Sequence, residues 1–364
     1  MVTNSQVTIG RCDFHLGRDD YSLSETLLFQ NDYHKWKRIR KIMGQAFTPI
    51  KLKDQMPYNE HIADRLVDHL EQYSSTGTNF DIKNSLVSFS LDVINAYVFG
   101  ASINTFDNND HPFLVNANKL FSYTTNNTNF IQMMIKKRQH ILNNNNNNNN
   151  SNSREQYLND KELTEQAIIL LITGFESMSN SLCNAVYYLA KHPDCQQKLY
   201  EEVFTYFSNR QTDSYDMAIN ELKYLNAVIN ETLRMAPPVA YFPRLIAQDY
   251  KFKNTNITLP KGSVLLVQPY VMHRWPQYYA DPDMFNPNRF MDPMSKPPSN
   301  VFIPFGNGPR ICIAQYFALN EMRISIAKLI LNYDFALAPG FQISYYNLNE
   351  LMNPKQVLVN IRKR

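Results

Sequence analysis

One cysteine in this chain is placed to bind a metal as a thiolate. Cys312 lies on a glycine-containing loop, just before an amphipathic run over residues 314–332. A thiolate at a helix N-terminus feels the positive end of the helix dipole, which keeps the sulfur ionised. Gly306 and Gly308 permit a tight turn whose amides point at the sulfur, and Arg310 adds a fixed cation. Taken alone, a cysteine such as Cys312 is more often a small buried hydrophobe on a turn.

An acid and a hydroxyl follow a glycine in the most apolar helical segment. A glycine inside a buried helix costs about 1 kcal/mol relative to alanine, so Gly174 is expected to serve packing or function. Ser177 lies one turn after Thr173, so its hydroxyl can donate to the carbonyl of residue 173 and loosen the helix. Together with Glu176, this arrangement suits proton delivery to bound dioxygen. A packing glycine beside a solvated glutamate is the alternative.

A tryptophan and an arginine share one face of a basic helical segment. Trp36 and Arg40 are four residues apart, so an indole N–H and a guanidinium can donate to one carboxylate. A basic surface helix that packs one tryptophan is the alternative. Four more cations lie in this segment, and a run of this kind usually forms a solvated face: Lys35, Lys37, Arg38 and Lys41.

A second motif pairs two opposite charges in a helical segment. Glu231 and Arg234 are three residues apart, so they share a helical face and can form an ion pair. Taken alone, this spacing is typical of an ordinary surface pair. Apolar neighbours and the prolines that follow indicate burial, and breaking a buried pair costs about 3–5 kcal/mol. The pair is therefore predicted to be architectural.

Composition limits the classes of protein to which this chain can belong. With 364 residues, of which 44% are hydrophobic and only ten are glycine, it can bury a large core and favours helices. A net charge of +3 argues against general nucleic-acid binding. No run of 18 apolar residues and no signal-peptide core is present. Wide cysteine spacing suggests neither disulfides nor a zinc site, and fits a reducing compartment: Cys12, Cys183, Cys195 and Cys312.

Hydrophobic periodicity predicts the helices that position these groups: residues 32–49, 59–73, 81–99, 160–191, 194–208, 220–235 and 314–332. The longest is expected to begin at a capping box of Asn159 and Glu162 and to be buried nearly all round. Short strands are expected over residues 241–271, followed by an ordered, irregular meander over 275–304. The Asn/Ser-rich tract 143–153 is expected to be a disordered surface insert.

The loop that carries the cysteine resembles a known family. Residues 305–314 are similar to the cysteine loop of the cytochrome P450 family, whose pattern is Phe-x-x-Gly-x-Arg-x-Cys-x-Gly. Phe305, Gly308, Arg310 and Cys312 match this pattern. Ala314 stands where the family usually has glycine.

The other motifs resemble those of the same family in kind and in order, over about residues 20–360. The segment from Trp36 to Arg40 is similar to the helix that binds a haem propionate. The segment from Gly174 to Ser177 is similar to the oxygen-activation motif. The family's Glu-x-x-Arg motif, matched at residues 231–234, joins an arginine of the meander, matched here by Arg289. By resemblance, this cluster would lock the meander beneath the cysteine loop.

The resemblance implies a mainly α (α+β) fold, namely a cytochrome P450-like helical domain with small β-sheets. It assigns residues 1–364 to a single haem-thiolate domain of the eukaryotic microsomal type, expected to be incomplete, with truncation at the N-terminus and shortening before the oxygen-activation helix. The implied cofactor is haem b (iron protoporphyrin IX), with Cys312 as the axial iron ligand. Glu176 and Ser177 would guide protons, and the remaining cofactor-binding residues would be Trp36, Arg40, Arg244, Phe305, Gly306 and Arg310.

By the same resemblance, the reaction is monooxygenation of a small apolar organic substrate. Electrons would come from a separate NADPH-dependent flavoprotein reductase or a similar donor, since the chain has no flavin or nicotinamide fingerprint. No nucleic acid is expected as a partner. The expected location is intracellular, either cytoplasmic or peripheral to the endoplasmic reticulum membrane, with no anchor in this chain. A non-catalytic or decayed haem-binding paralogue is the main alternative, and a redox-independent isomerase or dehydratase is a third.

Overall fold

The computed structural model describes residues 8–10, 25–101, 103–107, 129–145, 156–208, 221–292, 297–346 and 351–364. Cys12 lies outside these ranges. The Asn/Ser-rich tract also lies outside them from residue 146 on, so its expected disorder is not addressed. Its first three residues are helical, which corrects the prediction that the insert begins at residue 143.

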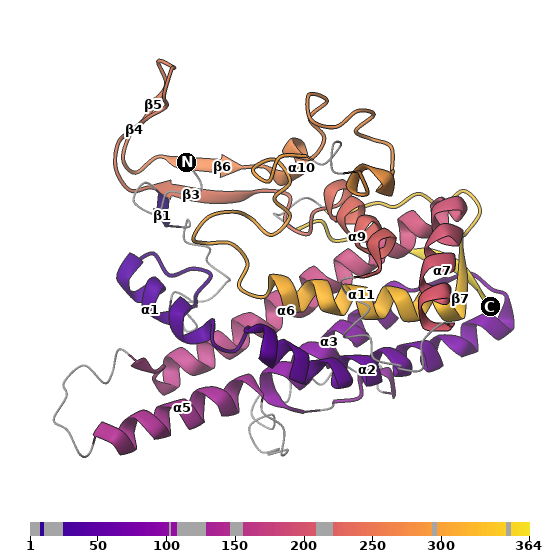
Figure 1. The fold of residues 1–364 in the computed structure, drawn as a ribbon, viewed down its shortest axis with the longest axis horizontal. Coiled ribbons are helices and arrows are strands. Elements are labelled where there is room, and N and C mark those ends of the chain that lie inside the picture. Colours follow the sequence, from indigo (N-terminus) through magenta and orange to yellow (C-terminus); the bar gives the residue numbers. More distant parts are fainter. Residues whose placement is uncertain are drawn as a thin grey trace.

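The described part of the chain is mainly helical, as the sequence predicts. Its helices are α1 (Tyr33–Met43), α2 (Pro49–Thr76), α3 (Lys83–Phe99), α5 (Phe130–Asn145), α6 (Asp160–Lys191), α7 (Pro193–Ser208), α9 (Lys223–Met235), α10 (Pro269–Met272) and α11 (Gln315–Asn332). Two short 3₁₀ turns, η1 (Thr105–Asp107) and η4 (Pro287–Phe290), complete the set in these ranges. In Figure 1, α2, α3, α6 and α11 run side by side and form the body of the molecule.

Helix boundaries follow local chemistry more closely than hydrophobic periodicity does. The predicted helix over residues 32–49 is wrong at its C-terminal end, because α1 stops at Met43 and α2 begins at Pro49. Proline fixes its own φ and lacks an N–H, so it suits the first position of a new helix and not the end of an old one. The predicted capping box is confirmed, because Asn159 and Glu162 each accept a backbone N–H of the other.

Within the described ranges, three small antiparallel sheets accompany the helices. Their strands are β1 (Thr8–Gly10), β2 (Phe80–Asp81), β3 (Phe242–Ile246), β4 (Tyr250–Lys251), β5 (Thr258–Leu259), β6 (Val264–Val267), β7 (Tyr333–Leu337) and β8 (Leu358–Lys363). The strand orders are β1-β3-β6, β2-β8-β7 and β4-β5. In the first sheet Phe242 pairs with Val267, and in the second Tyr333 pairs with Lys363. The first sheet lies above the loop that leads into α11, and the second lies near the C-terminus (Figure 1).

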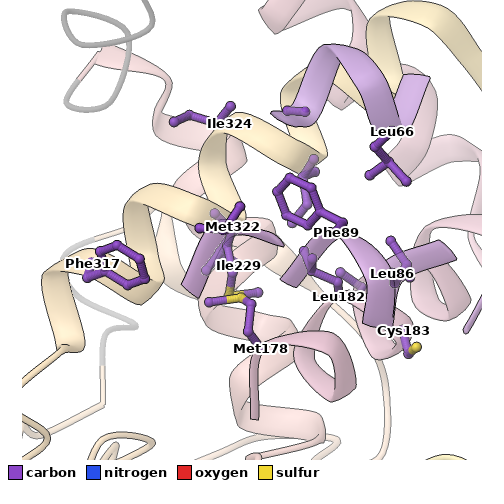
Figure 2. Close-up of a cluster of buried hydrophobic side chains, with 14 of the residues drawn as sticks. Leu66, Leu86, Phe89, Met178, Leu182, Cys183, Ile229, Phe317, Met322 and Ile324 are labelled. Atoms are coloured by element: carbon purple, nitrogen blue, oxygen red, sulfur yellow. The ribbon is translucent and has the colours of Figure 1, made fainter. Parts of the chain in front are cut away.

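The hydrophobic core lies where α3, α6, α9 and α11 meet. Figure 2 shows Phe89 of α3, Leu182 of α6, Ile229 of α9 and Met322 of α11 pointing into one cluster. Each of these side chains is at most 1% exposed. Burial of side chains of this size stabilises the fold by about 1.5–3 kcal/mol each. The core therefore holds α6, which carries the acid–hydroxyl motif, and α11, which follows the cysteine loop, in a fixed relation. No helix in the described ranges is long and apolar enough to cross a membrane.

Candidate active site

The loop that carries Cys312 is closed by its own backbone. The N–H of Gly306 donates to the carbonyl of Ile303 at 3.0 Å, and the N–H of Cys312 donates to that of Phe305 at 2.9 Å. Gly306 and Gly308 have φ angles of 77° and 78°, a region that side chains rarely tolerate. The predicted tight turn is therefore confirmed. The cysteine side chain is exposed in the protein alone, three residues before α11 begins.

The one departure from the family pattern is compatible with the backbone. Ala314 is the N-cap residue of α11, with φ −96° and ψ 17°. That conformation is open to any L residue, so the turn does not need glycine here.

Cations gather around the tryptophan of α1, close to the cysteine. Trp36 is buried, and its ring lies 4.7 Å from the guanidinium carbon of Arg310 and 6.0 Å from that of Arg40. Burial lowers the pKa of the Arg40 guanidinium, and the charge of Cys312 acts in the opposite direction. Arg310 also donates to the carbonyl of Gln30 at 2.8 Å. The fold thus brings together α1 and the cysteine loop, which are about 270 residues apart in the chain.

Arg244 packs against the ring of Phe242, and this ring lies beside the same loop. Its side chain is 2% exposed on β3, and its guanidinium carbon lies 4.3 Å from the ring of Phe242. Its Nη1 donates to the carbonyl of Pro243 at 2.9 Å. A Cβ added to Gly306 would lie 4.0 Å from the far edge of the Phe242 ring. The Phe242 ring therefore lies beside both Arg244 and the cysteine loop.

The acid–hydroxyl motif lies in the middle of α6. Ser177 Oγ donates to the carbonyl of Thr173 at 2.7 Å, which confirms the predicted bond. A Cβ on Gly174 would lie 2.7 Å from side-chain carbons of Ile94, so this glycine allows α3 to pack closely against α6. The packing explanation offered for Gly174 is thus the one that the contacts support.

The carboxyl group of Glu176 is half-buried and held by the C-terminal segment. Asn353 Nδ2 donates to Glu176 Oε1 at 3.4 Å. Burial raises the pKa of the Glu176 carboxyl, whereas the Asn353 hydrogen bond and the charge of Lys83 lower it. Asn353 and Lys83 were not identified from the sequence, because no motif links these residues to the acid.

The site fits the haem that the resemblance implies. Residues 172–177 are partly exposed although Leu171 and Met178, on either side of them in α6, are buried. Cys312 is exposed as well, and Arg244 and Arg310 place buried cations near the cysteine loop. An apolar disc that binds a thiolate and carries carboxylates would cover these surfaces and neutralise these cations.

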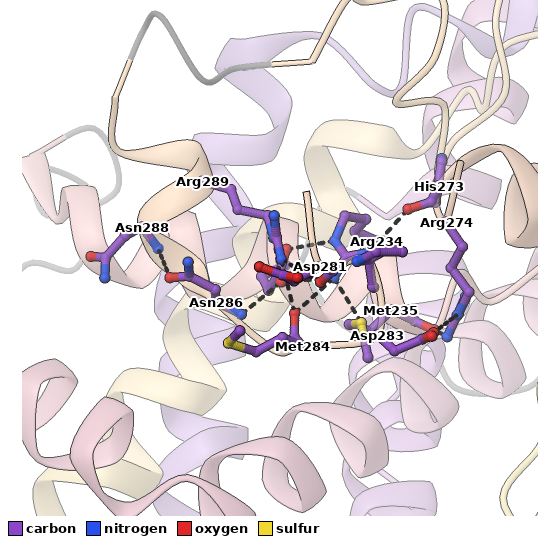
Figure 3. Close-up of polar contacts among 12 residues, drawn as sticks. Arg234, Met235, His273, Arg274, Asp281, Asp283, Met284, Asn286, Asn288 and Arg289 are labelled. Atoms are coloured by element: carbon purple, nitrogen blue, oxygen red, sulfur yellow. Dashed lines mark hydrogen bonds and ion pairs between the residues drawn. The ribbon is translucent and has the colours of Figure 1, made fainter. Parts of the chain in front are cut away.

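A buried ion cluster around Glu231 supports the loop, and Figure 3 shows its members Arg234, Asn286 and Arg289. Glu231 Oε2 accepts from Arg234 Nε at 2.7 Å, and Glu231 Oε1 accepts from Arg289 Nε at 3.2 Å. The N–H of Asn286 donates to the same Oε1 at 2.7 Å. The side chains of Glu231 and Arg234 are 0% exposed. The predicted ion pair and its third member are therefore confirmed, and the cluster ties α9 to the meander.

His273 connects this cluster to the cysteine loop. Its carbonyl accepts from Arg234 Nη1 at 3.0 Å, and its Nε2 accepts from the N–H of Ile303 at 3.0 Å. Ile303 is two residues before Phe305, where the loop closes. Burial, together with the charge of Arg234, lowers the pKa of His273 to about 3. No spacing in the sequence marks this residue.

The basic face predicted on α1 is only partly correct. Arg38 forms an ion pair with Glu162 of α6, and Lys35 forms one with Glu25. Lys37 and Lys41 are exposed. Two of the four cations are thus paired with carboxylates, because the start of α6 and the segment before α1 supply acids that the local sequence does not reveal.

A cavity of about 830 Å³ lies where α1, α5 and the start of α6 meet. Charged side chains dominate its lining, among them Arg38, Arg138, Asp160 and Glu162. Such a lining does not suit an apolar ligand. This cavity is therefore not assigned to the chemistry of Cys312.

Comparisons with known proteins agree with the motifs. A family model described as Cytochrome P450 matches residues 3–135 and 113–360. The chain is 31% identical over 353 residues to Cytochrome P450 3A29 of Sus scrofa, covering 85% of this chain and 69% of the relative. It is 32% identical over 358 residues to Cytochrome P450 3A7 of Homo sapiens, covering 85% and 69%. It is 30% identical over 380 residues to Cytochrome P450 3A16 of Mus musculus, covering 91% and 73%.

Proposed function

This chain belongs to the cytochrome P450 family, and from that premise we propose that it oxygenates a small apolar organic substrate with electrons from a separate NADPH-dependent flavoprotein reductase or a similar donor. Its family makes it an oxidoreductase, a haem monooxygenase whose haem b has a cysteine thiolate as axial ligand. The bound haem supplies activation of dioxygen at its iron. The location that we propose is intracellular, at or near the endoplasmic reticulum membrane.

The observation that carries the assignment of the site is the convergence of Trp36, Arg40 and Arg310 beside Cys312. In this proposal the Cys312 thiolate is the iron ligand, held in the loop that begins at Phe305 and turns at Gly306 and Gly308. The three side chains around it would donate to the haem propionates, joined by Arg244 from β3. The Arg40 guanidinium is half-buried and desolvated, so carboxylates of the cofactor would offset this cost.

The acid and the hydroxyl of α6 have separate proposed roles. Glu176 would carry a proton on its half-buried carboxyl group, whose pKa burial raises. Ser177 orients a proton through its hydroxyl, which the carbonyl of Thr173 already fixes. The apolar residues of α6 on either side of the motif exclude bulk water.

The proposed electron donor would meet the exposed cations of α1. Lys37 and Lys41 lie on the helix that carries Trp36, and Lys37 Nζ lies 5.8 Å from the ring of Tyr33. A positive surface beside the cofactor steers an acidic partner toward it and raises the association rate.

The test separates an active enzyme from a decayed paralogue that only binds haem. The purified protein is reduced in the presence of carbon monoxide, its difference spectrum is recorded, and NADPH consumption is then measured with an added reductase. We expect the red-shifted band of a thiolate-bound haem and reductase-dependent consumption of NADPH. The thiolate band without NADPH consumption would favour the decayed paralogue.

The matched pair of variants is Cys312→Ser and Cys195→Ser. Cys195, on α7, is buried, and burial raises the pKa of its thiol, so it remains protonated. We expect the thiolate band to disappear in Cys312→Ser and to remain in Cys195→Ser. Retention of the band in Cys312→Ser would overturn the assignment of the ligand.

A further inference from the structure

Beyond the roles proposed above, we infer that Lys83 and Asn353 form a clamp that holds the Glu176 carboxyl in place and keeps it able to both bind and release a proton. Both are positioning residues, since they act through Glu176. This inference rests on the proposed role of Glu176. It concerns three segments that are distant in the chain: the start of α3, the middle of α6 and the segment before β8.

The clamp is a short chain of hydrogen bonds. Lys83 Nζ donates to Asn353 Oδ1 at 2.8 Å and to the carbonyl of Pro354 at 2.5 Å. The other end of the same amide, Asn353 Nδ2, donates to Glu176 Oε1 at 3.4 Å. Lys83 and Glu176 are both half-buried, so water screens these contacts only in part.

The lysine decides which way the amide points. An ammonium group can only donate, so Lys83 holds the oxygen of Asn353 toward itself and leaves the NH₂ group facing Glu176. A flipped amide would place its oxygen against the carboxylate and its NH₂ against the ammonium, with a repulsive contact at each end. The clamp therefore presents a hydrogen-bond donor to Glu176, and a donor favours the ionised form of the acid.

The hydrogen bond from Asn353 and burial have opposite effects on the pKa of Glu176. Burial alone raises the pKa of the Glu176 carboxyl, and the Asn353 bond followed by the charge of Lys83 are the causes that lower it. Desolvation favours the protonated form of the acid, and the hydrogen bond from Asn353 favours the ionised form. Proton transfer is most efficient when the pKa of the group lies near the working pH, and these two opposing influences act together on the pKa of Glu176.

Other ionisable groups near the clamp act on it less directly. From the end of β2, Asp81 Oδ1 accepts from the backbone N–H of Lys83 and from that of Val357. From α6, Cys183 is fully buried, and burial raises its pKa to about 12, so it stays neutral. On the C-terminal segment, Lys355 is exposed and its backbone N–H donates to the carbonyl of Ser344. Among the groups named here, Lys83 is therefore the cation that contacts the Asn353 amide.

The first test follows the coupling of NADPH consumption to product formation in the haem-loaded protein from pH 6 to 9. Glu176→Gln identifies the part of the profile that depends on the acid. In Lys83→Met and in Asn353→Leu we expect that part to move to higher pH by about one unit. Lys355→Met, which removes a neighbouring exposed lysine, is the matched control and should leave the profile in place.

The second readout does not depend on turnover. Urea unfolding of the haem-loaded protein is measured from pH 5 to 8. A raised native pKa means that the folded state binds the extra proton, so stability falls as the pH rises toward that pKa. The loss of folding stability should continue to a higher pH in Lys83→Met than in the unmodified protein. This difference should vanish when Glu176→Gln is also present.

The outcomes separate the two claims. If Glu176→Gln leaves the coupling profile unchanged, the catalytic role proposed for Glu176 fails, while the clamp is still judged by unfolding. If neither clamp variant moves the profile or the unfolding curve, the clamp is refuted. It is also refuted if the shift persists in the Glu176→Gln background. Asn353→Leu and Lys83→Met remove opposite ends of the clamp, so either variant suffices if the other does not fold.

Discussion

Lowering the pH from 7 to 5 is expected to destabilise this protein through His273. The imidazole is buried, and its Nε2 accepts a hydrogen bond from the N–H of Ile303. The ring is therefore neutral, with its proton on Nδ1. Burial, followed by the charge of Arg234, lowers the pKa of the imidazole to about 3. Protonation of Nε2 would also remove the acceptor of the Ile303 N–H.

The magnitude follows from proton linkage. A histidine in an unfolded chain has a pKa of about 6.5, so the unfolded state takes up a proton as the pH falls below that value. The folded state does not do so until the pH approaches about 3. The unfolded state thus binds more protons across this window, and stability is lost as the pH falls through it. Between pH 7 and pH 5 the loss attributable to His273 is about 2 kcal/mol.

The assay is urea unfolding at pH 7, 6 and 5, with His273→Gln as the variant that does not titrate. The stability advantage of the unmodified protein over His273→Gln should shrink by about 2 kcal/mol between pH 7 and pH 5. His61 is exposed on α2, so His61→Gln is the matched control and should show no such trend. A pH-independent advantage, or the same trend in the control, would refute the buried neutral imidazole.

Three further predictions concern other parts of the molecule. Glu231→Gln should lower the free energy of unfolding by about 3–5 kcal/mol, because the buried Arg234 guanidinium loses the carboxylate that pairs with it. A loss below about 1 kcal/mol in urea unfolding would contradict this. Gly174→Ala should destabilise by about 1–2 kcal/mol, because the added methyl meets Ile94. In an Ile94→Val background the same change should cost less, and an equal cost in both backgrounds would count against the packing explanation. Lys37→Glu with Lys41→Glu should slow electron transfer from an acidic reductase and weaken its salt dependence, measured by stopped-flow reduction. An unchanged rate at low salt would place the reductase elsewhere.

Much of the candidate site could be predicted from the sequence, because its motifs are local. The turn before Cys312 needs glycine at positive φ, and Gly306 and Gly308 stand where the backbone requires it. A three-residue spacing aligns Glu231 and Arg234 on one helical face wherever that helix lies. These features depend on a few neighbouring residues, so they are readable without the fold.

Other features depended on partners far away in the chain. The local sequence places Lys35 and Arg38 on an exposed basic face, yet each pairs with an acid from another segment. Periodicity does not predict the break between α1 and α2, because the apolar pattern continues across it while Pro49 starts a new helix. The spacing of apolar residues indicates which face of a helix is buried, but it does not indicate where the helix ends.

The sequence by itself determined which groups this protein can use: a cysteine on a constrained loop, an acid beside a hydroxyl in an apolar helix, and arginines within recognisable motifs. Only the tertiary structure decided which of them meet. Trp36 reaches Arg310 across more than 270 residues, and Asn353 reaches Glu176 across 177. Such contacts arise when helices and loops pack around a common core, and side-chain packing between distant segments is not encoded in local spacing.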